Sequence, residues 1–214
     1  MFNTILPKIH KEGYKFLAIS ILATFIILIF SKFLGSIFIL ISVWVYYFFR
    51  DPDRISINDD NYLVSPADGL ITDISEKSGP EELRLENTSF TRISVFMNVF
   101  NCHVNRVPSS GKIEEIFYKP GKFLNASLDK ASEENERNYF KVRLNNGEEI
   151  IIVQIAGLIA RRIVCEVEQG QELKQGDRIG MIRFGSRVDI YFKNKKILAK
   201  LGQNVVAGES LLAS

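Results

Sequence analysis

The chain begins with a long apolar stretch that divides it into two parts. Residues 14–30 and 33–49 form two runs of 17 residues each, in which Lys15 is the only charged residue, and Lys32 lies between them. About 20 apolar residues are typical of a helix that spans a bilayer, so each run lies at the short end of that range. A cleaved signal peptide would have one short apolar core followed by small residues, whereas the second run here ends in an aromatic cluster, Trp44 to Phe49. We therefore expect residues 1–50 to form a helical hairpin that either crosses or dips into a membrane.

Charge predicts the orientation of this hairpin. Lys8, Lys11 and Lys15 stand before or at the start of the first run, and Arg50 and Arg54 follow the second. Basic residues at both outer ends favour a cytoplasmic location for the N-terminus and for everything after residue 50, in a protein of the cell membrane. The remainder of the chain is slightly acidic, which argues against a nucleic-acid binder. Two cysteines give no disulfide framework and fit a reducing compartment.

Residues 51–214 have the pattern of a mainly β domain. Runs rich in β-branched and aromatic residues recur between turn residues, starting near Leu70, Arg92, Gly111, Asn138, Glu148 and Arg161. The break Asn145-Asn146-Gly147 is typical of a β-hairpin turn. Segment 124–137 is polar, and we expect it to form a short helix or a mobile loop. Regular strands with Gly and Pro between them predict a barrel or sandwich.

An internal echo refines this fold prediction. GQELKQGDRIG from Gly170 and GQNVVAGESLL from Gly202 share a Gly-Gln start and a Gly-acidic pair six residues on. Paired turns of this kind are similar to the hammerhead hairpins of biotinyl and lipoyl carrier domains, which form a barrel-sandwich hybrid. Those carriers place a modifiable lysine at the hairpin tip, whereas Gly185-Ser186 lies between the two echoes here. We therefore expect a barrel-sandwich-hybrid-like domain that is not a carrier.

The Gly185-Ser186 pair is the main candidate for chemistry. Glycine has no side chain to shield its carbonyl and tolerates strained backbone geometry. A serine hydroxyl beside such a carbonyl is suited to an N-to-O acyl shift. An ordinary Gly-Ser turn between two strands is the alternative for the dipeptide taken alone.

Three further strings accompany this pair in a fixed order. They are SPADG from Ser65, CHVNRVP from Cys102 and NERN from Asn135, followed by RFGSRVD around Ser186. Together with the apolar hairpin, they resemble the short-chain branch of the phosphatidylserine decarboxylases. The resemblance covers the chain from the hairpin to the C-terminus.

The resemblance implies a self-processed pyruvoyl enzyme. Ser186 would attack the Gly185 carbonyl, and elimination and hydrolysis would leave a covalent pyruvoyl group at position 186. The products would be a β subunit of residues 1–185 and an α subunit of residues 186–214, which stay together as a heterodimer. A Schiff base between pyruvoyl and the serine amine would then allow decarboxylation of phosphatidylserine to phosphatidylethanolamine, with no other cofactor. The hairpin would keep the site at the membrane that holds this substrate.

Roles for three neighbouring residues follow from the resemblance. Asp68 would orient a base or activate Ser186, and His103 would transfer a proton during decarboxylation, with a further part in processing. Longer-chain members carry two histidines three residues apart, the second of which belongs to an Asp-His-Ser processing triad, but Arg106 stands at that second position here. Either His103 serves both steps, or Asp68 and backbone strain suffice. Arg106 would bind the substrate's phosphate or carboxylate.

Two other functions fit parts of the same pattern. One is decarboxylation of a related serine phospholipid such as archaetidylserine, because the strings do not report on the lipid tails. The other is a membrane-anchored barrel-sandwich scaffold without activity. Self-cleavage distinguishes the enzymes from the scaffold, and defined lipids distinguish the two enzymes.

Overall fold

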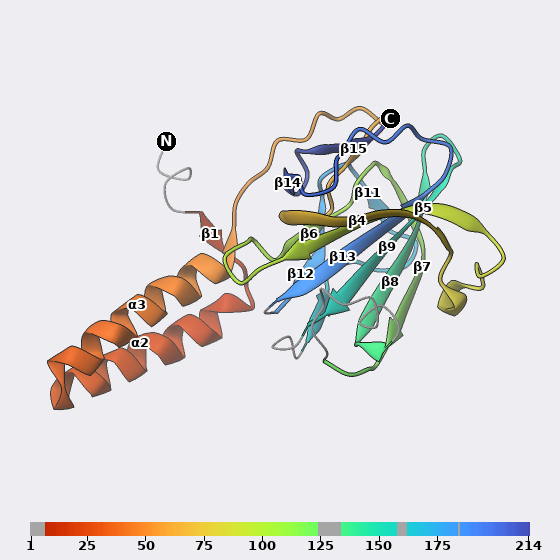
Figure 1. Cartoon of the computed structure of the whole chain (residues 1–214). Coiled ribbons are helices and arrows are strands. Elements are labelled where there is room, and N and C mark those ends of the chain that lie inside the picture. The colour runs from red at the N-terminus through yellow and green to blue at the C-terminus, as the bar shows by residue number, and fades with distance from the viewer. Residues whose placement is uncertain (1–6, 124–133, 158–161, 184) are drawn as a thin grey trace. The chain divides into compact units, whose positions relative to one another are not determined.

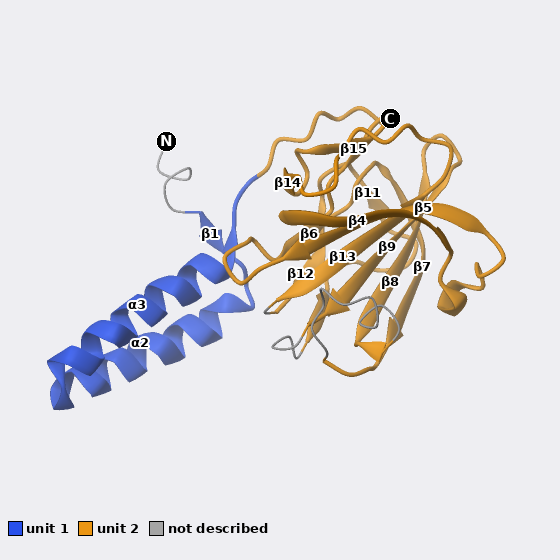
Figure 2. Cartoon of the chain, viewed as in Figure 1, with its two compact units in different colours: residues 1–53 blue, residues 54–214 orange. Residues whose placement is uncertain are grey.

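The computed structural model of the chain divides into two compact units. It describes residues 7–123, 134–157, 162–183 and 185–214. Unit 1 comprises residues 1–53 and unit 2 comprises residues 54–214 (Figure 2). We call them the hairpin and the β domain, and each is described by itself.

The hairpin consists of two apolar helices, as predicted. Helix α2 spans Gly13–Phe30 and α3 spans Lys32–Phe48 (Figure 1). The extended residue Ser31 separates them, and its Oγ accepts a hydrogen bond from the backbone N–H of Leu34 at 3.3 Å, which caps α3. At the other end, strand β1 (Lys8–Ile9) pairs antiparallel with β2 (Arg50–Asp51) and closes the base.

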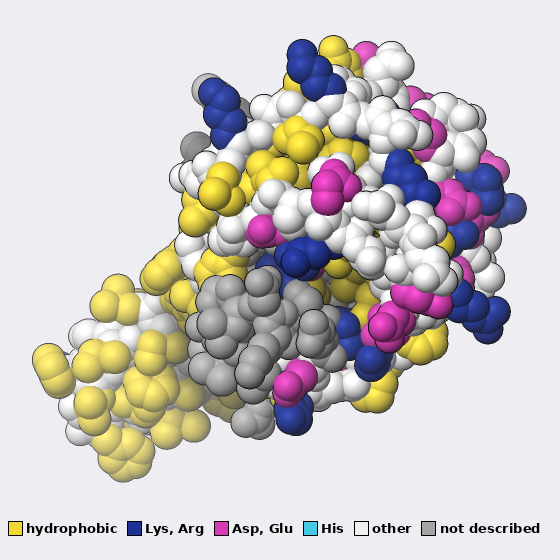
Figure 3. All heavy atoms as spheres, turned by 45° about the vertical axis from the view of Figure 1, so that its right-hand side comes forward, with side chains coloured by type: hydrophobic (Ala, Val, Ile, Leu, Met, Phe, Trp, Pro, Cys, Tyr) yellow, Lys and Arg dark blue, Asp and Glu magenta, His cyan; other side chains and the backbone are white. Residues whose placement is uncertain are grey.

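The surface of the hairpin suits a lipid environment. Among the described residues, α2 is the one helix long and apolar enough to cross a membrane, and α3 is apolar but one residue shorter. Hydrophobic side chains cover the visible face of the hairpin at the lower left of Figure 3. Thr24 and Ser42 join the helices through their hydroxyls at 3.0 Å, so these polar groups are satisfied within the hairpin.

The β domain is built on antiparallel sheets, which confirms the prediction of a mainly β fold. The largest sheet has eight strands in the order β11-β7-β8-β9-β13-β5-β4-β14. These strands are β4 (Gly69–Ser78), β5 (Ser89–Met97), β7 (Gly111–Lys119), β8 (Arg137–Leu144), β9 (Glu149–Ala156), β11 (Glu172–Leu173), β13 (Ser186–Phe192) and β14 (Asn204–Val205).

Two smaller sheets complete the part of the domain that the structure describes. One has the order β10-β12-β6, and the other pairs β15 with β3. Their strands are β3 (Leu63–Val64), β6 (Val104–Arg106), β10 (Ile163–Cys165), β12 (Arg178–Ile182) and β15 (Leu211–Ala213). A 3₁₀ turn, η1, covers Glu81–Leu83.

The predicted hairpin turn lies between β8 and β9. Gly147 has a φ of +86°, and its N–H donates to the Leu144 carbonyl at 2.9 Å. The strand expected from Arg161 is observed as β10, which spans Ile163–Cys165, while Arg161 itself lies outside the described residues. Residues 124–133 of the predicted helix or loop lie outside the described residues, while the end of that segment enters β8 at Arg137.

The two echoed segments adopt matching backbone geometry. Gly170 and Gly202 have φ values of +88° and +79°, and Gly176 and Gly208 have +85° and +76°. The N–H of Gly170 donates to Ile113 at the start of one segment, and that of Gly202 donates to Ile71 at the start of the other. The strands that follow, β11 and β14, pair with β7 and β4 at opposite ends of the eight-stranded sheet. The paired-turn prediction is therefore matched in position and conformation.

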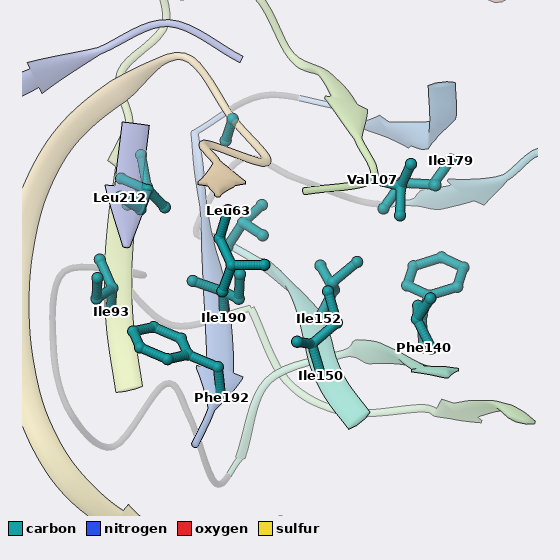
Figure 4. Close-up of a cluster of buried hydrophobic side chains, with 14 of the residues drawn as sticks. Leu63, Ile93, Val107, Phe140, Ile150, Ile152, Ile179, Ile190, Phe192 and Leu212 are labelled. Carbon is teal, nitrogen blue, oxygen red and sulfur yellow. The ribbon is translucent and has the colours of Figure 1, made fainter. Parts of the chain in front are cut away.

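The main core lies against one face of the eight-stranded sheet. Val188, Ile190 and Phe192 of β13 belong to it, together with alternate residues of the neighbouring strands. Figure 4 shows Ile190 and Phe192 near Ile150 and Ile152 of β9. Because strand side chains alternate between faces, Ser186 lies on the same face of β13 as these three core residues.

Candidate active site

Ser186 is the first residue of β13 and is completely buried. Its backbone pairs with Met97 on β5 and with Ala156 on β9, so the serine lies between two strands. Among the described residues, its Oγ has no hydrogen-bond partner. A buried hydroxyl without a partner is unfavourable for stability, and such exceptions concentrate at functional sites.

Gly185, the residue before it, adopts a left-handed backbone. Its φ is +53°, a conformation in which a side chain costs about 1–2 kcal/mol. A Cβ at this position would meet nothing within 4 Å. Glycine is therefore needed here for its backbone conformation and not because neighbouring atoms exclude a side chain.

His103 lies fully buried beside the strand that leads to this pair. Its Nδ1 is 3.0 Å from the carbonyl oxygen of Asn101. Its own carbonyl accepts a hydrogen bond from Ile182, the last residue of β12, at 3.3 Å. The CHVNRVP string is therefore held by its backbone only a few residues before Gly185.

A chain of buried amides connects two of the strings that carry the resemblance, CHVNRVP and NERN. Gln154 on β9 donates to Asn105 at 2.8 Å and accepts from Asn138 at 3.4 Å. Asn105 also approaches the sulfur of Met97, the β5 partner of Ser186, at 3.5 Å. Asn135 donates to the carbonyl of Ala156, the β9 partner of Ser186, at 2.7 Å. CHVNRVP and NERN thus meet around the residues that flank the serine.

Asp68 is held by two well-defined contacts. Oδ1 accepts the backbone N–H of Ala207 at 2.8 Å, and Oδ2 pairs with the Arg54 guanidinium at 2.7 Å. The next residue, Gly69, lies so close to the Phe96 carbonyl that a Cβ would overlap it. Phe96 precedes Met97, so the SPADG string packs beside the β5 residue opposite Ser186.

Arg106 is buried at the junction of the two echoed segments. Its Nη1 donates to the carbonyl of Gly176 at 2.7 Å, and its Cδ lies close to Gly208. Its backbone N–H donates to Pro66 of SPADG at 2.9 Å. Arg106 is thus a structural link between CHVNRVP and SPADG.

A polar cavity of about 790 Å³ lies on the other face of the sheet. Its lining includes Arg92, Arg137, Asp189 and Tyr191. Asp189 and Tyr191 alternate with the core residues of β13 and so face away from the Ser186 side. Burial, with the nearby Asp189 carboxylate, raises the pKa of Tyr191 to about 12, so its phenol is neutral at physiological pH. This cavity is therefore distinct from the serine site.

Some residues of the site were not singled out from the sequence. Gln154 interrupts an otherwise apolar strand, EIIIVQIA, and a lone amide in such a run is a signal for a buried polar contact. Asn105, Asn135 and Asn138 stand inside the strings that carried the resemblance, but no role was assigned to them. Nothing in the sequence distinguishes Arg54, the partner of Asp68, from the other basic residues near the hairpin.

Comparison with known proteins identifies the family of the chain. The family model described as phosphatidylserine decarboxylase matches residues 41–213. The phosphatidylserine decarboxylase proenzyme of Pelagibacter ubique (strain HTCC1062) is 66% identical over 213 residues, covering 100% of this chain and 99% of the relative. The proenzymes of Ruegeria pomeroyi and Rickettsia akari are 49% and 48% identical and cover 100% and 99% of this chain, and 98% and 92% of their own lengths. The chain therefore belongs to the phosphatidylserine decarboxylase family.

Proposed function

We propose that this chain is a proenzyme that cleaves itself between Gly185 and Ser186 and then decarboxylates phosphatidylserine to phosphatidylethanolamine. The observation that carries the assignment to Ser186 is its buried Oγ, which has no hydrogen-bond partner among the described residues and follows a left-handed glycine. The names of the similar proteins support the reaction, since each is a phosphatidylserine decarboxylase proenzyme.

The cleavage uses only atoms of the chain and water. Ser186 Oγ adds to the Gly185 carbonyl carbon, its proton passes to the amide nitrogen of residue 186, the C–N bond breaks, and an ester with a free amine replaces the amide. Loss of the α-proton of residue 186 then expels the Gly185 carboxylate and leaves dehydroalanine. Hydrolysis of the dehydroalanine releases ammonia and leaves a pyruvoyl group, which supplies the electron sink for decarboxylation.

The fold explains how the two fragments stay together after cleavage. The smaller fragment, residues 186–214, contains β13, which pairs along its length with both β5 and β9. It also contains β14 and β15, which pair with β4 and β3 of the larger fragment. Four strand pairings and the β13 side chains in the core support a stable heterodimer of residues 1–185 and 186–214.

His103, Asp68 and Arg106 take supporting roles in this proposal. His103 is the one histidine of the β domain, and we assign it the proton transfer at the substrate α-carbon. Asp68 supplies a carboxylate, fixed by Arg54, for self-cleavage. Arg106 contributes positive charge for the substrate phosphate or carboxylate while one of its donors binds Gly176.

The hairpin supports action at a membrane. Its apolar surface fits association with the bilayer that contains the lipid substrate. Basic residues at both outer ends of the hairpin favour the cytoplasmic side for the β domain.

Intact-mass analysis of Ser186→Ala tests the assignment. Wild-type chain should yield fragments of residues 1–185 and 186–214, the second with a blocked terminus that borohydride reduces, whereas Ser186→Ala should stay whole and release no carbon dioxide. Ser94→Ala is the matched control, because Ser94 is also a fully buried strand serine whose Oγ has no partner among the described residues. A wild-type chain that remains at 24.4 kDa would instead support the scaffold function. Cleavage of Ser186→Ala would mean that another serine is the nucleophile.

A further inference from the structure

The hairpin contains an elongated apolar cavity of its own. Its volume is about 870 Å³, and all of the residues that line it belong to unit 1. Leu17, Ile21 and Leu28 of α2 face it from one side, and Ile39 and Val43 of α3 from the other. We call this cavity the hairpin groove.

The length of the groove matches one leaflet of a bilayer. Leu17 and Leu28 are 11 residues apart on α2, which corresponds to about 16 Å at the rise of an α-helix. One leaflet of a bilayer has a hydrocarbon depth of about 15 Å, half of the core thickness. Near the tip of the hairpin the helices approach closely, since a Cβ at Gly35 would overlap the Leu28 side chain. The groove therefore has the length of one acyl chain and ends where the helices converge.

Small side chains line the middle of the groove. Thr24 and Ser42 face it, and their hydroxyls are 3.0 Å apart. Thr24 also donates to the carbonyl of Ser20 at 2.8 Å. Because these polar atoms are satisfied within the hairpin, the groove presents hydrocarbon to its occupant and leaves space that a larger residue would fill.

Residues that carry polar head groups line the other end of the groove. Tyr46, Tyr47 and Arg50 line it there, at the base of the hairpin. The Arg50 guanidinium lies over the Tyr47 ring at 3.7 Å and donates to the Tyr47 carbonyl at 2.7 Å. Tyrosine and arginine are typical of the level of lipid headgroups, and arginine binds phosphate in a planar geometry. Since lipid tails are as apolar as the groove, selection among lipids depends on this charged end.

We propose that the hairpin groove holds one acyl chain of an anionic phospholipid, whose phosphate pairs with Arg50. This inference rests on the proposed function only in that it identifies how the enzyme takes hold of a lipid before decarboxylation. A phosphate beside Arg50 and a chain that reaches toward Leu28 follow from the charge at one end of the groove and from its length. The occupant is an anionic phospholipid of the surrounding bilayer, recognised by its phosphate and one acyl chain and not by a serine headgroup.

Native mass spectrometry of detergent-solubilised protein tests the proposal. Wild-type protein would be exposed to equal amounts of phosphatidylglycerol and phosphatidylcholine, neither of which carries a serine to decarboxylate. We expect one phosphatidylglycerol molecule to stay bound per chain, and the retained amount of phosphatidylglycerol to be at least fivefold that of phosphatidylcholine. Arg50→Gln should bring that ratio close to one, and Arg50→Lys should preserve part of the preference. A parallel measurement with phosphatidylserine on Ser186→Ala asks whether the substrate binds in the same way.

A matched pair of substitutions tests the location of the chain. Ser42→Phe places a ring in the groove and should lower lipid retention at least fivefold, whereas Leu40→Phe lies on α3 outside the groove, at a side chain that is 70% exposed, and should retain the lipid. Circular dichroism checks that both variants keep their helices. Equal retention in the two variants, equal retention of the two headgroups by wild type, or a second copy of the chain in place of lipid would overturn the proposal. Lipid retention without self-cleavage would instead contradict the proposed function and leave the groove intact.

Discussion

Gly185→Ala separates the conformational role of this glycine from a steric one. The φ of +53° costs an alanine about 1–2 kcal/mol, while the absence of atoms within 4 Å means that the added methyl group has space. The chain should therefore fold, but residue 185 should leave the left-handed conformation in most molecules. If attack by Ser186 requires that conformation, self-cleavage should slow by roughly 5–30-fold, because each 1.36 kcal/mol corresponds to a factor of ten in rate.

The assay is a time course of cell-free synthesis in which the uncleaved chain and its fragments are resolved by mass. Gly147→Ala is the control, because Gly147 also has a positive φ of +86° and no atom within 4 Å of an added Cβ, but lies in the β8–β9 turn. It should lose similar stability and cleave at the wild-type rate. Gly185→Asn should fall between wild type and Gly185→Ala, because asparagine tolerates the left-handed region better. Wild-type cleavage of Gly185→Ala, or equal slowing by Gly147→Ala, would refute the reasoning.

Three further predictions concern the network around the site and the opposite face. Gln154→Leu should lower the free energy of unfolding by roughly 2–4 kcal/mol in urea titrations, since Asn105 loses a buried partner; an unchanged midpoint would contradict this. Burial alone would raise the pKa of Glu82, but its interactions with Lys119 and Arg137 outweigh burial and lower that pKa. The Glu82 carboxylate therefore stabilises the folded state fully above its unfolded pKa near 4.5, and this stabilisation is lost as the pH falls through the lower, folded-state pKa. Glu82→Gln should flatten thermal stability against pH in that acidic range, and an unchanged slope would exclude Glu82 as the cause. Arg106→Ala should raise KM for phosphatidylserine about tenfold, and normal KM with normal cleavage would remove Arg106 from substrate binding.

The sequence predicts the elements more fully than their contacts. Uninterrupted apolar runs predict the two helices, and runs of alternating residues predict the long strands, because both patterns reflect which side chains are in an apolar environment. The repeated Gly-acidic pairs indicate equivalent turns, and Gly176 and Gly208 indeed share a similar positive φ. These features are local, so a single chain is enough to identify them.

The contacts around the site are not local and could not be predicted in the same way. The resemblance gave Asp68, His103 and Ser186, but no pattern indicates that the Asp68 carboxylate binds Arg54 and Ala207, which are 14 and 139 residues away. Likewise, the pairing of Gln154 with Asn105 depends on which strands adjoin in the sheet. Strand order is set by the packing of the whole domain, and residue spacing carries little information about it.

The echoed segments suggest why Asp68 carries a charge. In one half of the domain the N–H of Ala207 donates to the Asp68 carboxylate, and in the other half the N–H of Gln175 donates to Ser110 Oγ at 3.2 Å. Ala207 and Gln175 each precede a glycine with positive φ, so the two bonds serve equivalent turns. A neutral hydroxyl is sufficient for the turn at Ser110. The turn therefore does not require the negative charge of Asp68 or the Arg54 partner that balances it. This additional ion pair belongs to the echoed turn near Gly69, which packs beside Phe96 and so beside Met97, the β5 partner of Ser186.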